Sequence, residues 1–284
     1  MKLNEERINE ISDAIKDFGI YSILRLEENY DPQFKSIQNV SQRIGKNYSS
    51  AYSLLVSLVS YRLAMKGEDW WDCFSKYFSE KDIPKNYDEL IKNVIDFINS
   101  CRGSIIGREN KIKRIKKVSL NARDLLIKIL NEPNLILNEP NKIMKEISKA
   151  LNSQEWRKTI SFSIKMAYYA VKDRNELKPL LIKIPLPIDL RISCITYTSN
   201  LIDAESYKKI LSSPKMAIYA WDCISEKSGV PQIHLDSLLW TIGWIPRNMG
   251  IKEGRKKVVD ILKNISDEEK SEKIAEQFLI KECR

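Results

Sequence analysis

The chain has 284 residues, of which 43% are hydrophobic, and its formal net charge is +9. This length suits one large domain or two lobes that share a core. No run of about 18 uncharged apolar residues occurs and the N-terminus is highly charged, so neither a transmembrane helix nor a signal peptide is predicted. The basic balance favours nucleic acid or an anionic surface as partner, although a lysine-rich organism produces the same balance.

The cysteine and histidine content argues against a metal centre or a disulfide framework. The five cysteines are far apart and form no Cys-x-x-Cys pair. The single histidine, His234, cannot supply a histidine-based metal site. The sequence therefore predicts a cytoplasmic protein that uses no metal and no other cofactor.

Apolar residues recur with helical spacing from the N-terminus onward. A stripe over residues 8–18 predicts a first helix that stops at Gly19. Asp31 and Pro32 are typical of an N-cap and a first helical residue, and the helix that they open is expected to run to Gly45.

Residues 51–67 are apolar on most faces, which predicts a buried central helix that ends at Gly67. Asp69 is expected to cap a short aromatic helix that carries Trp70 and Trp71. Adjacent residues cannot share one face of a helix, so we expect one tryptophan to pack inward and the other to be more available. Packing of both in the core is the alternative.

A further amphipathic helix is predicted over residues 86–101, and the densest basic run of the chain follows it. Six of the ten residues 108–117 are Lys or Arg. Such a run contacts DNA phosphates in some proteins and is a solvated face in others. Lys113, Arg114 and Lys117 are the candidates for contacts to a DNA backbone.

The rest of the chain is also helical in pattern. Two helical patterns occupy residues 119–151, another helix is expected from Asn152, and an amphipathic helix is expected to end at Gly229. Alternation with period two is never sustained, so no strand is predicted. The predicted fold class is all-α, with about a dozen helices.

Lys158 is a candidate nucleophile because of its expected place in a helix. Asn152 and Glu155 form the pattern of a capping box, which puts Lys158 within two turns of a helix N-terminus, with Phe162 on the same face. An amine attacks only when neutral, and a free lysine has a pKa of about 10.4. Burial shifts a lysine pKa by about 3–5 units and a helix dipole by less than about one, so we expect Lys158 to be buried. The alternative is an ordinary surface lysine.

Asp189 is the candidate partner of this lysine. The sequence PLPIDLR places Asp189 two residues after Pro187, at a predicted helix start. A carboxylate fixed there stabilises a cationic sugar transition state or takes a proton from the amine. The alternative is an aspartate that only caps its helix.

Three blocks of sequence resemble the archaeal 8-oxoguanine DNA glycosylase/lyases, a divergent branch of the helix-hairpin-helix glycosylases. They are KTISFSIKMAYYA, PLPIDLR and WDCISEKSGVPQIHLDSLLW, and the shorter DPQF and EDWW also fit. The blocks occur in the family's order over roughly residues 25–250. The segment KEISKALNSQEWR lacks the glycine-rich hairpin of the wider superfamily, which agrees with the atypical hairpin of the archaeal branch.

The resemblance implies a chemical role for the pair. Lys158 would attack C1′ of the sugar and displace the oxidised base, and the resulting Schiff base would allow β-elimination. Asp189 would stabilise the oxocarbenium-like charge and help to activate the amine.

The resemblance also implies a set of base-binding residues, namely Gln33, Trp71, Phe162, Pro187, Asp236 and Trp240. Gln38 and Gln42 remain alternatives to Gln33, and Trp70 remains an alternative to Trp71. His234 is expected to be structural or on the surface.

Two helical lobes with the active site in the cleft between them are implied by the same resemblance. Roughly residues 1–100 and the C-terminal part would form one lobe, and roughly residues 101–200 would form the lobe with the atypical hairpin and the lysine. The expected partner is DNA that contains 8-oxoguanine, with no membrane, and the expected state is a monomer. The alternatives are a silent helical DNA-binding protein, which the presence of both Lys158 and Asp189 disfavours, and a glycosylase for a different damaged base.

Overall fold

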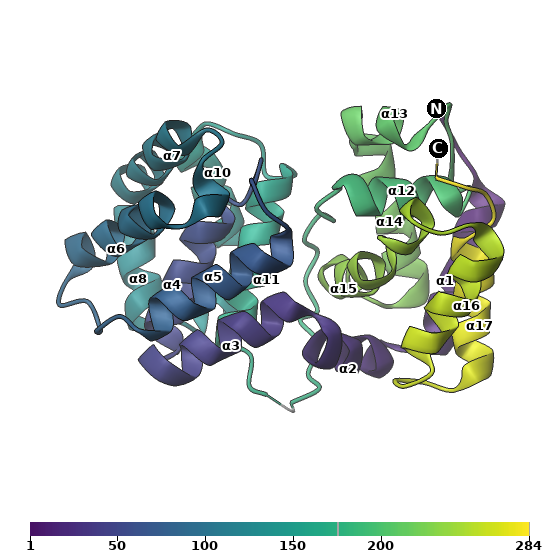
Figure 1. Ribbon diagram of the computed structural model, residues 1–284, viewed down its shortest axis with the longest axis horizontal. Coiled ribbons are helices and arrows are strands. Elements are labelled where there is room, and N and C mark those ends of the chain that lie inside the picture. Colours follow the sequence, from purple (N-terminus) through teal and green to yellow (C-terminus); the bar gives the residue numbers. More distant parts are fainter. Residues whose placement is uncertain (175, 284) are drawn as a thin grey trace. The chain divides into compact units, whose positions relative to one another are not determined.

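The computed structural model describes residues 1–174 and 176–283, which form two compact units (Figure 1). Unit 1 comprises Met1–Asp31 and the described residues from Leu177 onward. Unit 2 comprises Pro32–Glu176 except for the one undescribed position. The described residues hold seventeen α-helices and a single two-stranded ladder, so the predicted all-α class is confirmed, while the predicted dozen helices was too few.

The elements of unit 2 are helical throughout the described residues. They are α3 (Pro32–Ile44), α4 (Lys46–Ser57), α5 (Gly67–Ser79), α6 (Tyr87–Ser100), the 3-10 turn η1 (Arg102–Ser104), α7 (Arg108–Asn121), α8 (Arg123–Asn131), α9 (Leu135–Asn138), α10 (Pro140–Leu151) and α11 (Lys158–Val171).

The elements of unit 1 come from both ends of the chain. They are β1 (Lys2–Leu3), α1 (Glu5–Phe18), α2 (Ile20–Tyr30), α12 (Leu190–Thr198), β2 (Ile202–Asp203), α13 (Tyr207–Ser212), α14 (Lys215–Ser228), α15 (Gln232–Ile242), the 3-10 turn η2 (Ile245–Arg247), α16 (Ile251–Leu262) and α17 (Glu268–Phe278).

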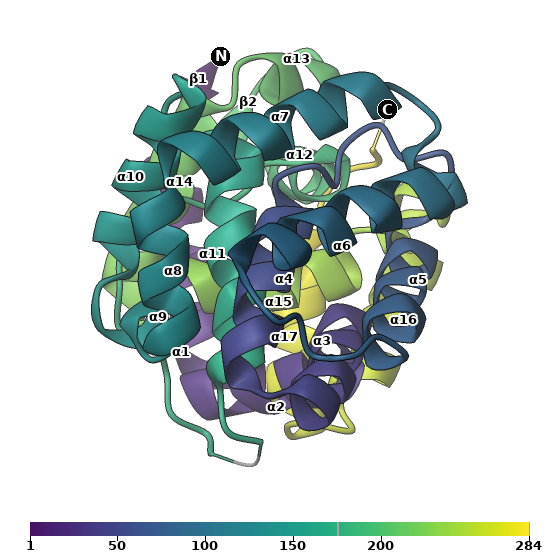
Figure 2. The same cartoon turned by 90° about the vertical axis from the view of Figure 1, so that its left-hand side faces the viewer.

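Helix α11 is the centre of unit 2. It packs against α3, α4, α9 and α10, and nearly all of its side chains after the first turn are buried. Helix α7 crosses near the N-terminal end of α11 (Figure 2). Because α3 and α4 bury their apolar faces against α11, residues 32–100 belong to the same compact unit as the lysine-bearing helix. The units thus group these residues differently from the lobes expected from sequence.

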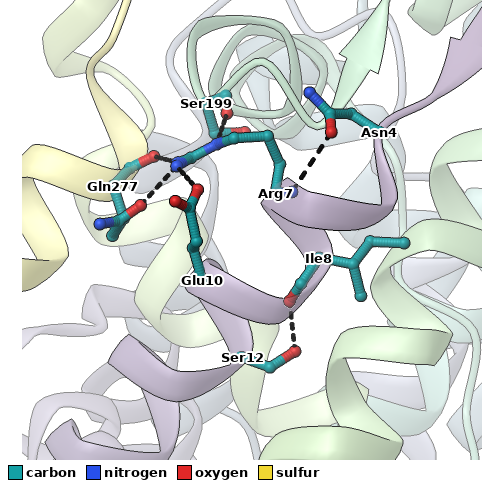
Figure 3. Close-up of polar contacts among 7 residues, drawn as sticks. All are labelled: Asn4, Arg7, Ile8, Glu10, Ser12, Ser199 and Gln277. Atoms are coloured by element: carbon teal, nitrogen blue, oxygen red, sulfur yellow. Dashed lines mark hydrogen bonds and ion pairs between the residues drawn. The ribbon is translucent and has the colours of Figure 1, made fainter.

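The two ends of the chain meet within unit 1, and Arg7 of α1 joins them (Figure 3). Its side chain donates to the carbonyl of Ser199 at 3.0 Å and to both the side chain and the carbonyl of Gln277 at 2.6 Å. Glu10 accepts from the same guanidinium. A half-exposed carboxylate and three carbonyl-type acceptors therefore satisfy this largely buried cation.

Several predicted helix boundaries are confirmed. Helix α1 ends at Phe18 with Gly19 as its C-cap, α3 begins at Pro32, and α14 ends just before Gly229. The predicted helix over residues 51–67 is wrong, because α4 ends at Ser57 and the next helix starts at Gly67. In between, Arg62 adopts a left-handed conformation (φ 47°), which a helix cannot contain.

The tryptophan pair also departs from expectation, since Trp70 and Trp71 are both buried, at 0% and 1% exposure. Aromatic side chains from α5 and α6 surround them, so packing of both in the core is the alternative that holds. Asp69 lies in the first turn of α5, whose N-cap is Lys66.

Two small features of unit 1 were not predicted. Strands β1 and β2 pair as a short antiparallel ladder, with Lys2 opposite Asp203. A disulfide joins Cys194 of α12 to Cys283, which are 89 residues apart in the chain. The expectation of no disulfide was wrong because wide spacing in sequence says nothing about which cysteines the fold brings together.

A buried polar network holds α2 to α15 in unit 1. Glu27 and His234 are both fully buried. The N–H of Leu180 donates to Nε2 of His234 at 2.9 Å, so the imidazole proton resides on Nδ1, which lies 3.1 Å from Oε2 of Glu27. Ser237 donates to the same carboxylate oxygen at 2.9 Å. His234 is therefore structural, which is one of the two roles expected for it from the sequence.

We expect His234→Ala to lower the free energy of unfolding by about 3 kcal/mol or more, because it removes a donor from a buried carboxylate and leaves a cavity. Urea unfolding followed by circular dichroism measures this change. Lys227→Ala, which removes an exposed contact to Asn9, is the control and should cost less than about 0.5 kcal/mol. Equal stability of the two variants would contradict a structural role for the network.

Candidate active site

Lys158 is the first residue of α11, with Arg157 as N-cap. The expected helix start at Asn152 is wrong, because Asn152 instead ends α10 in the left-handed conformation (φ 52°, ψ 55°). Glycine is the usual residue at such a position, and asparagine is the usual substitute. The hairpin between α10 and α11 therefore needs no glycine, which accounts for the unusual sequence before Lys158.

Side-chain contacts close this hairpin. Ser148 donates through its hydroxyl to the carbonyl of Ser153 at 2.6 Å, and its own carbonyl accepts from the N–H of Ser153 at 2.9 Å. Lys117 of α7 donates to the carbonyl of Leu151 at 3.1 Å, at the negative end of the α10 dipole. These bonds fix the path of the six residues that lead to Lys158.

The surroundings of Lys158 differ from the predicted buried pocket, because its side chain is exposed. The next residue, Thr159, accepts a hydrogen bond at 3.0 Å from the guanidinium of Arg114. Burial lowers the pKa of Arg114 from its ordinary value. A half-buried cation thus contacts the residue that follows Lys158, and Lys158 itself is at a helix N-terminus with its side chain exposed.

The three candidate phosphate-binding residues occupy different environments on α7. Lys113 projects from the helix and is exposed. Arg114 contacts Thr159, and Lys117 contacts the end of α10. Two of the three thus hold the hairpin in place.

The structure brings Trp71 and Phe162 together within unit 2. Their ring centroids are 6.1 Å apart and their planes are inclined by 65°. Phe162 is half-buried and lies one turn beyond Lys158. Trp70 instead packs against Phe97 at 4.9 Å, so the structure favours Trp71 as the tryptophan beside the lysine-bearing helix.

The three candidate glutamines lie in different environments. Gln38 donates to the carbonyls of Tyr169 and Lys172, at 2.7 and 3.0 Å, so its amide holds the end of α11. Gln42 is exposed, whereas Gln33 is buried at 4% exposure. Burial alone therefore sets Gln42 apart from Gln33 and Gln38, since Gln38 is also buried, at 6% exposure.

Phe34, the neighbour of Gln33, contacts Tyr169 of α11, with the two ring centroids 5.2 Å apart. The start of α3, which carries Gln33, therefore packs against the lysine-bearing helix.

Asp189 is the N-cap of α12, which confirms the predicted helix start in unit 1. Its Oδ1 accepts from the N–H groups of Arg191 and Ile192, at 2.8 and 2.9 Å. The carboxylate is half-buried. Two backbone donors on one oxygen hold the carboxylate in a single orientation.

Asp236 and Trp240 lie one turn apart on α15, as their spacing predicts. Asp236 is buried at 3% exposure and Trp240 is half-buried. The guanidinium of Arg191 lies 4.1 Å from the centroid of the Trp240 ring. At Gly243, an added Cβ would be 3.0 Å from Cβ of Arg191, so α15 ends in close contact with the start of α12. Unit 1 therefore brings the Asp189 helix start and Trp240 together.

Two residues that the sequence analysis did not select position the segment before Asp189. Gln232 accepts from the N–H of Leu186 at 2.8 Å and donates to Asp222 at 2.8 Å. His234 accepts from the N–H of Leu180. Both belong to α15, so the helix that carries Asp236 also orders the extended chain that leads to Pro187. Their only signal in the sequence was proximity to Asp236.

No metal-binding group is evident in the described part of the chain. Residues 1–174 and 176–283 contain no cluster of three or more His, Cys, Asp or Glu side chains that would hold an ion. Every helix within these residues is too short or too polar to cross a membrane.

Comparison with known proteins identifies the family. The profile of the AGOG family, described as N-glycosylase/DNA lyase, matches residues 12–276. An N-glycosylase/DNA lyase of Aeropyrum pernix is 34% identical over 280 residues, which are 98% of this chain and 96% of that protein. The enzyme of the same description from Thermococcus kodakarensis is 28% identical over 266 residues, or 93% and 91% of the two chains.

A solved structure shares the fold over the full length. It is a crystal structure of an 8-oxoguanine DNA glycosylase from Pyrobaculum aerophilum in complex with 8-oxoguanosine. Its TM-score to this chain is 0.75, with 27% identity, and the match covers 99% of each chain. Because the family profile spans nearly all of the sequence and the Aeropyrum pernix relative matches over almost the full length, the chain belongs to the AGOG family of N-glycosylase/DNA lyases, as its sequence predicted.

Proposed function

We propose that this enzyme excises 8-oxoguanine from DNA and then nicks the strand at the abasic site. Family membership supplies the reaction class. The complex of the Pyrobaculum aerophilum relative with 8-oxoguanosine is the observation that carries the choice of base. The proposed partner is DNA that contains this base, and the proposed acting form is a cytoplasmic monomer.

Lys158 is the proposed nucleophile. Its Nζ forms a bond to C1′ while the bond from C1′ to the base breaks, and the base leaves with a proton. The amine then forms a Schiff base with the opened sugar, and loss of a C2′ proton expels the 3′ phosphate by β-elimination. Because Lys158 is exposed in the chain alone, the DNA itself must supply the desolvation that favours a neutral amine.

Asp189 is the proposed carboxylate for the cationic transition state. Its two backbone hydrogen bonds hold one oxygen and orient the group before substrate arrives. A pre-oriented carboxylate stabilises developing positive charge on the sugar without reorganisation, and it is also a base for the attacking amine.

The proposed base-binding groups divide by chemistry. Phe162 presents an aromatic face, with the buried ring of Trp71 packed against it, and Trp240 presents the face that Arg191 does not cover. Asp236 is a buried acceptor that matches the N1–H and amino donors of a guanine-type edge.

Two further groups provide for the polar edges of the extruded base. Gln33 contributes a buried amide, and Pro187 contributes its carbonyl. Only the oxidised base carries an N7–H, so an acceptor at that atom favours it over guanine, which would leave the acceptor unpaired. Recognition thus requires that the base leave the stack.

Lys158→Gln should abolish both nicking and borohydride-dependent trapping on a duplex with 8-oxoguanine, because the amide cannot form a Schiff base. The variant should still bind the duplex in a gel-shift assay. Lys149→Gln, which changes another exposed lysine close to the hairpin, is the matched control and should trap as the unchanged protein does. A trapped adduct with Lys158→Gln would assign the chemistry to a different amine.

Asp189→Asn should lower the single-turnover excision rate by about 10²–10⁴-fold with little change in stability. Asparagine caps helices about as well as aspartate, so the variant removes the charge and keeps the cap. Asp267→Asn makes the same change at the N-cap of α17 and should leave the rate unaltered. Similar rates for both variants would show that Asp189 is only a cap.

Lys113→Gln should reduce the dependence of DNA binding on salt by about one unit of log K per log of salt concentration, because one phosphate contact is lost. Affinities measured at several salt concentrations give this slope. Lys256→Gln, at an exposed position of α16, provides the comparison. An unchanged slope with Lys113→Gln would mean that this side chain faces solvent in the complex.

A further inference from the structure

Two free cysteines of unit 2 meet where α5 packs against α6. Cys73 of α5 is half-buried, and Cys101, the C-cap of α6, is buried at 2% exposure. They are 28 positions apart in the chain, yet the thiol of Cys73 donates a hydrogen bond to the sulfur of Cys101. The proposed excision chemistry uses neither side chain, so the pair is a candidate for a separate role.

Packed aromatic rings hold the two cysteines at this distance. The ring centroids of Trp70 and Phe97 are 4.9 Å apart, and these residues precede Cys73 and Cys101 by one helical turn each. The N–H of Cys101 donates to the carbonyl of Phe97 at 2.9 Å. At Gly103, an added Cβ would lie 2.8 Å from the ring of Trp70, so the backbone after Cys101 packs directly on α5. The contact between the thiols is therefore part of the packed structure.

The surroundings of Cys101 favour its thiolate form. The pKa of Cys101 is lowered to about 7, and the largest cause is its hydrogen bond with Cys73. The N–H of Gly103 and the positive charges of Lys111 and Arg108 lower this pKa further, against the effect of burial. An ordinary cysteine has a pKa of about 8.5, so Cys101 carries much more thiolate near neutral pH. The thiolate is the reactive form of a cysteine.

Lys111 of α7 is a buried cation that interacts with this thiolate. It is fully buried, and its Nζ lies 5.6 Å from the centroid of the Tyr61 ring and 5.8 Å from that of Trp70. Within the described residues, Nζ has no hydrogen-bond partner. Burial lowers the pKa of Lys111, and negative charge on Cys101 opposes that effect. Because a buried charge is costly unless an opposite charge compensates it, the ammonium and the thiolate stabilise each other.

We propose that Cys73 and Cys101 are a redox-active pair that hydrogen peroxide converts reversibly into a disulfide. The Cys101 thiolate attacks one peroxide oxygen and the O–O bond breaks, which leaves a sulfenic acid on Cys101 and releases hydroxide. Cys73 then attacks the sulfenic sulfur. The S–S bond forms, the S–O bond breaks, and water leaves with the proton of Cys73. The two cysteines lose two electrons, which the peroxide gains.

The geometry also selects the oxidant and the route back. A thiolate at 2% exposure suits a small oxidant such as peroxide better than a bulky disulfide. A dithiol reductant restores both cysteines by thiol–disulfide exchange. The modification is independent of the proposed excision chemistry, because neither step involves DNA.

The remaining cysteines provide internal controls. Cys194 and Cys283 are already joined to each other. Cys223 of α14 is half-buried, and its hydrogen-bond partner is the phenol of Tyr219. A phenol cannot resolve a sulfenic acid into a disulfide, so Cys223 has no route to the same product.

Peptide mapping of the full chain after treatment with peroxide tests the pair. The protein is unfolded, alkylated without reduction and digested. We expect a peptide in which Cys73 and Cys101 are linked with the loss of two hydrogens, and we expect reduction to abolish it, while Cys223 remains alkylated. In Cys73→Ser, the link cannot form and Cys101 should instead react with dimedone, a probe for sulfenic acid. Alkylation of both Cys73 and Cys101 in the oxidised, unchanged protein would overturn the proposal.

The dependence of disulfide formation on pH tests the role of the buried cation. In the unchanged protein, the rate should rise with pH and reach half of its maximum near pH 7, as Cys101 loses its proton. Lys111→Met removes the charge and keeps a long side chain against the rings, so this midpoint should move to higher pH. Lys116→Met, at an exposed position of the same helix, should not move it. Lys76, which acts on Cys73, is unchanged in both variants.

Equal midpoints for the two lysine variants, with Lys111→Met folded by circular dichroism, would contradict the pairing of Lys111 with the thiolate. If Lys111→Met does not fold, the peptide map of the unchanged protein and of Cys73→Ser still decides whether the cysteines form a redox pair.

Discussion

The turn between α10 and α11 is the constraint on which the proposed chemistry depends. Asn152 takes a left-handed conformation that ends α10, and the six-residue connection then starts a new helix at Lys158. Lys117 donates to the carbonyl of Leu151, which this ending leaves open, and the hydroxyl of Ser148 donates to the carbonyl of Ser153 in the connection. The amine therefore sits at the first position of a helix whose remaining turns are buried, so its backbone is fixed although its side chain is exposed.

Helix α15 holds the chain segment that leads to the carboxylate of Asp189. Helix α15 carries Asp236 and Trp240, and through Gln232 and His234 it also holds the extended segment that leads to Asp189. The network around Glu27 anchors this helix to α2. The proposed recognition of the base edge and the orientation of Asp189 thus both depend on α15, and the buried hydrogen bonds of Glu27 make the position of this helix costly to change.

Sequence patterns predicted the fold class, several helix ends and the family, because these depend on local periodicity and on motif order. The start of α11 was misplaced because asparagine is favoured both at an N-cap and at a left-handed C-terminal position, and residues 152–158 fit either arrangement. The exposure of Lys158 was not predictable, since spacing in the sequence shows which residues share a helix face. It does not show what covers that face. The hydrogen bonds of Gln38 to the end of α11 were not predictable either, since their acceptors come from residues about 130 positions away. The contact of Arg114 with Thr159 and the disulfide between Cys194 and Cys283 were not predictable for the same reason, because each joins residues that are far apart in the sequence.

Peptide mapping of the borohydride-trapped complex identifies which amine attacks the sugar. The protein is trapped on an 8-oxoguanine duplex, the DNA is digested, and the modified lysine is located by mass spectrometry. We expect a single sugar-modified residue, Lys158, at the first position of α11. A modification on any other amine, or intact protein that forms no adduct, would contradict it.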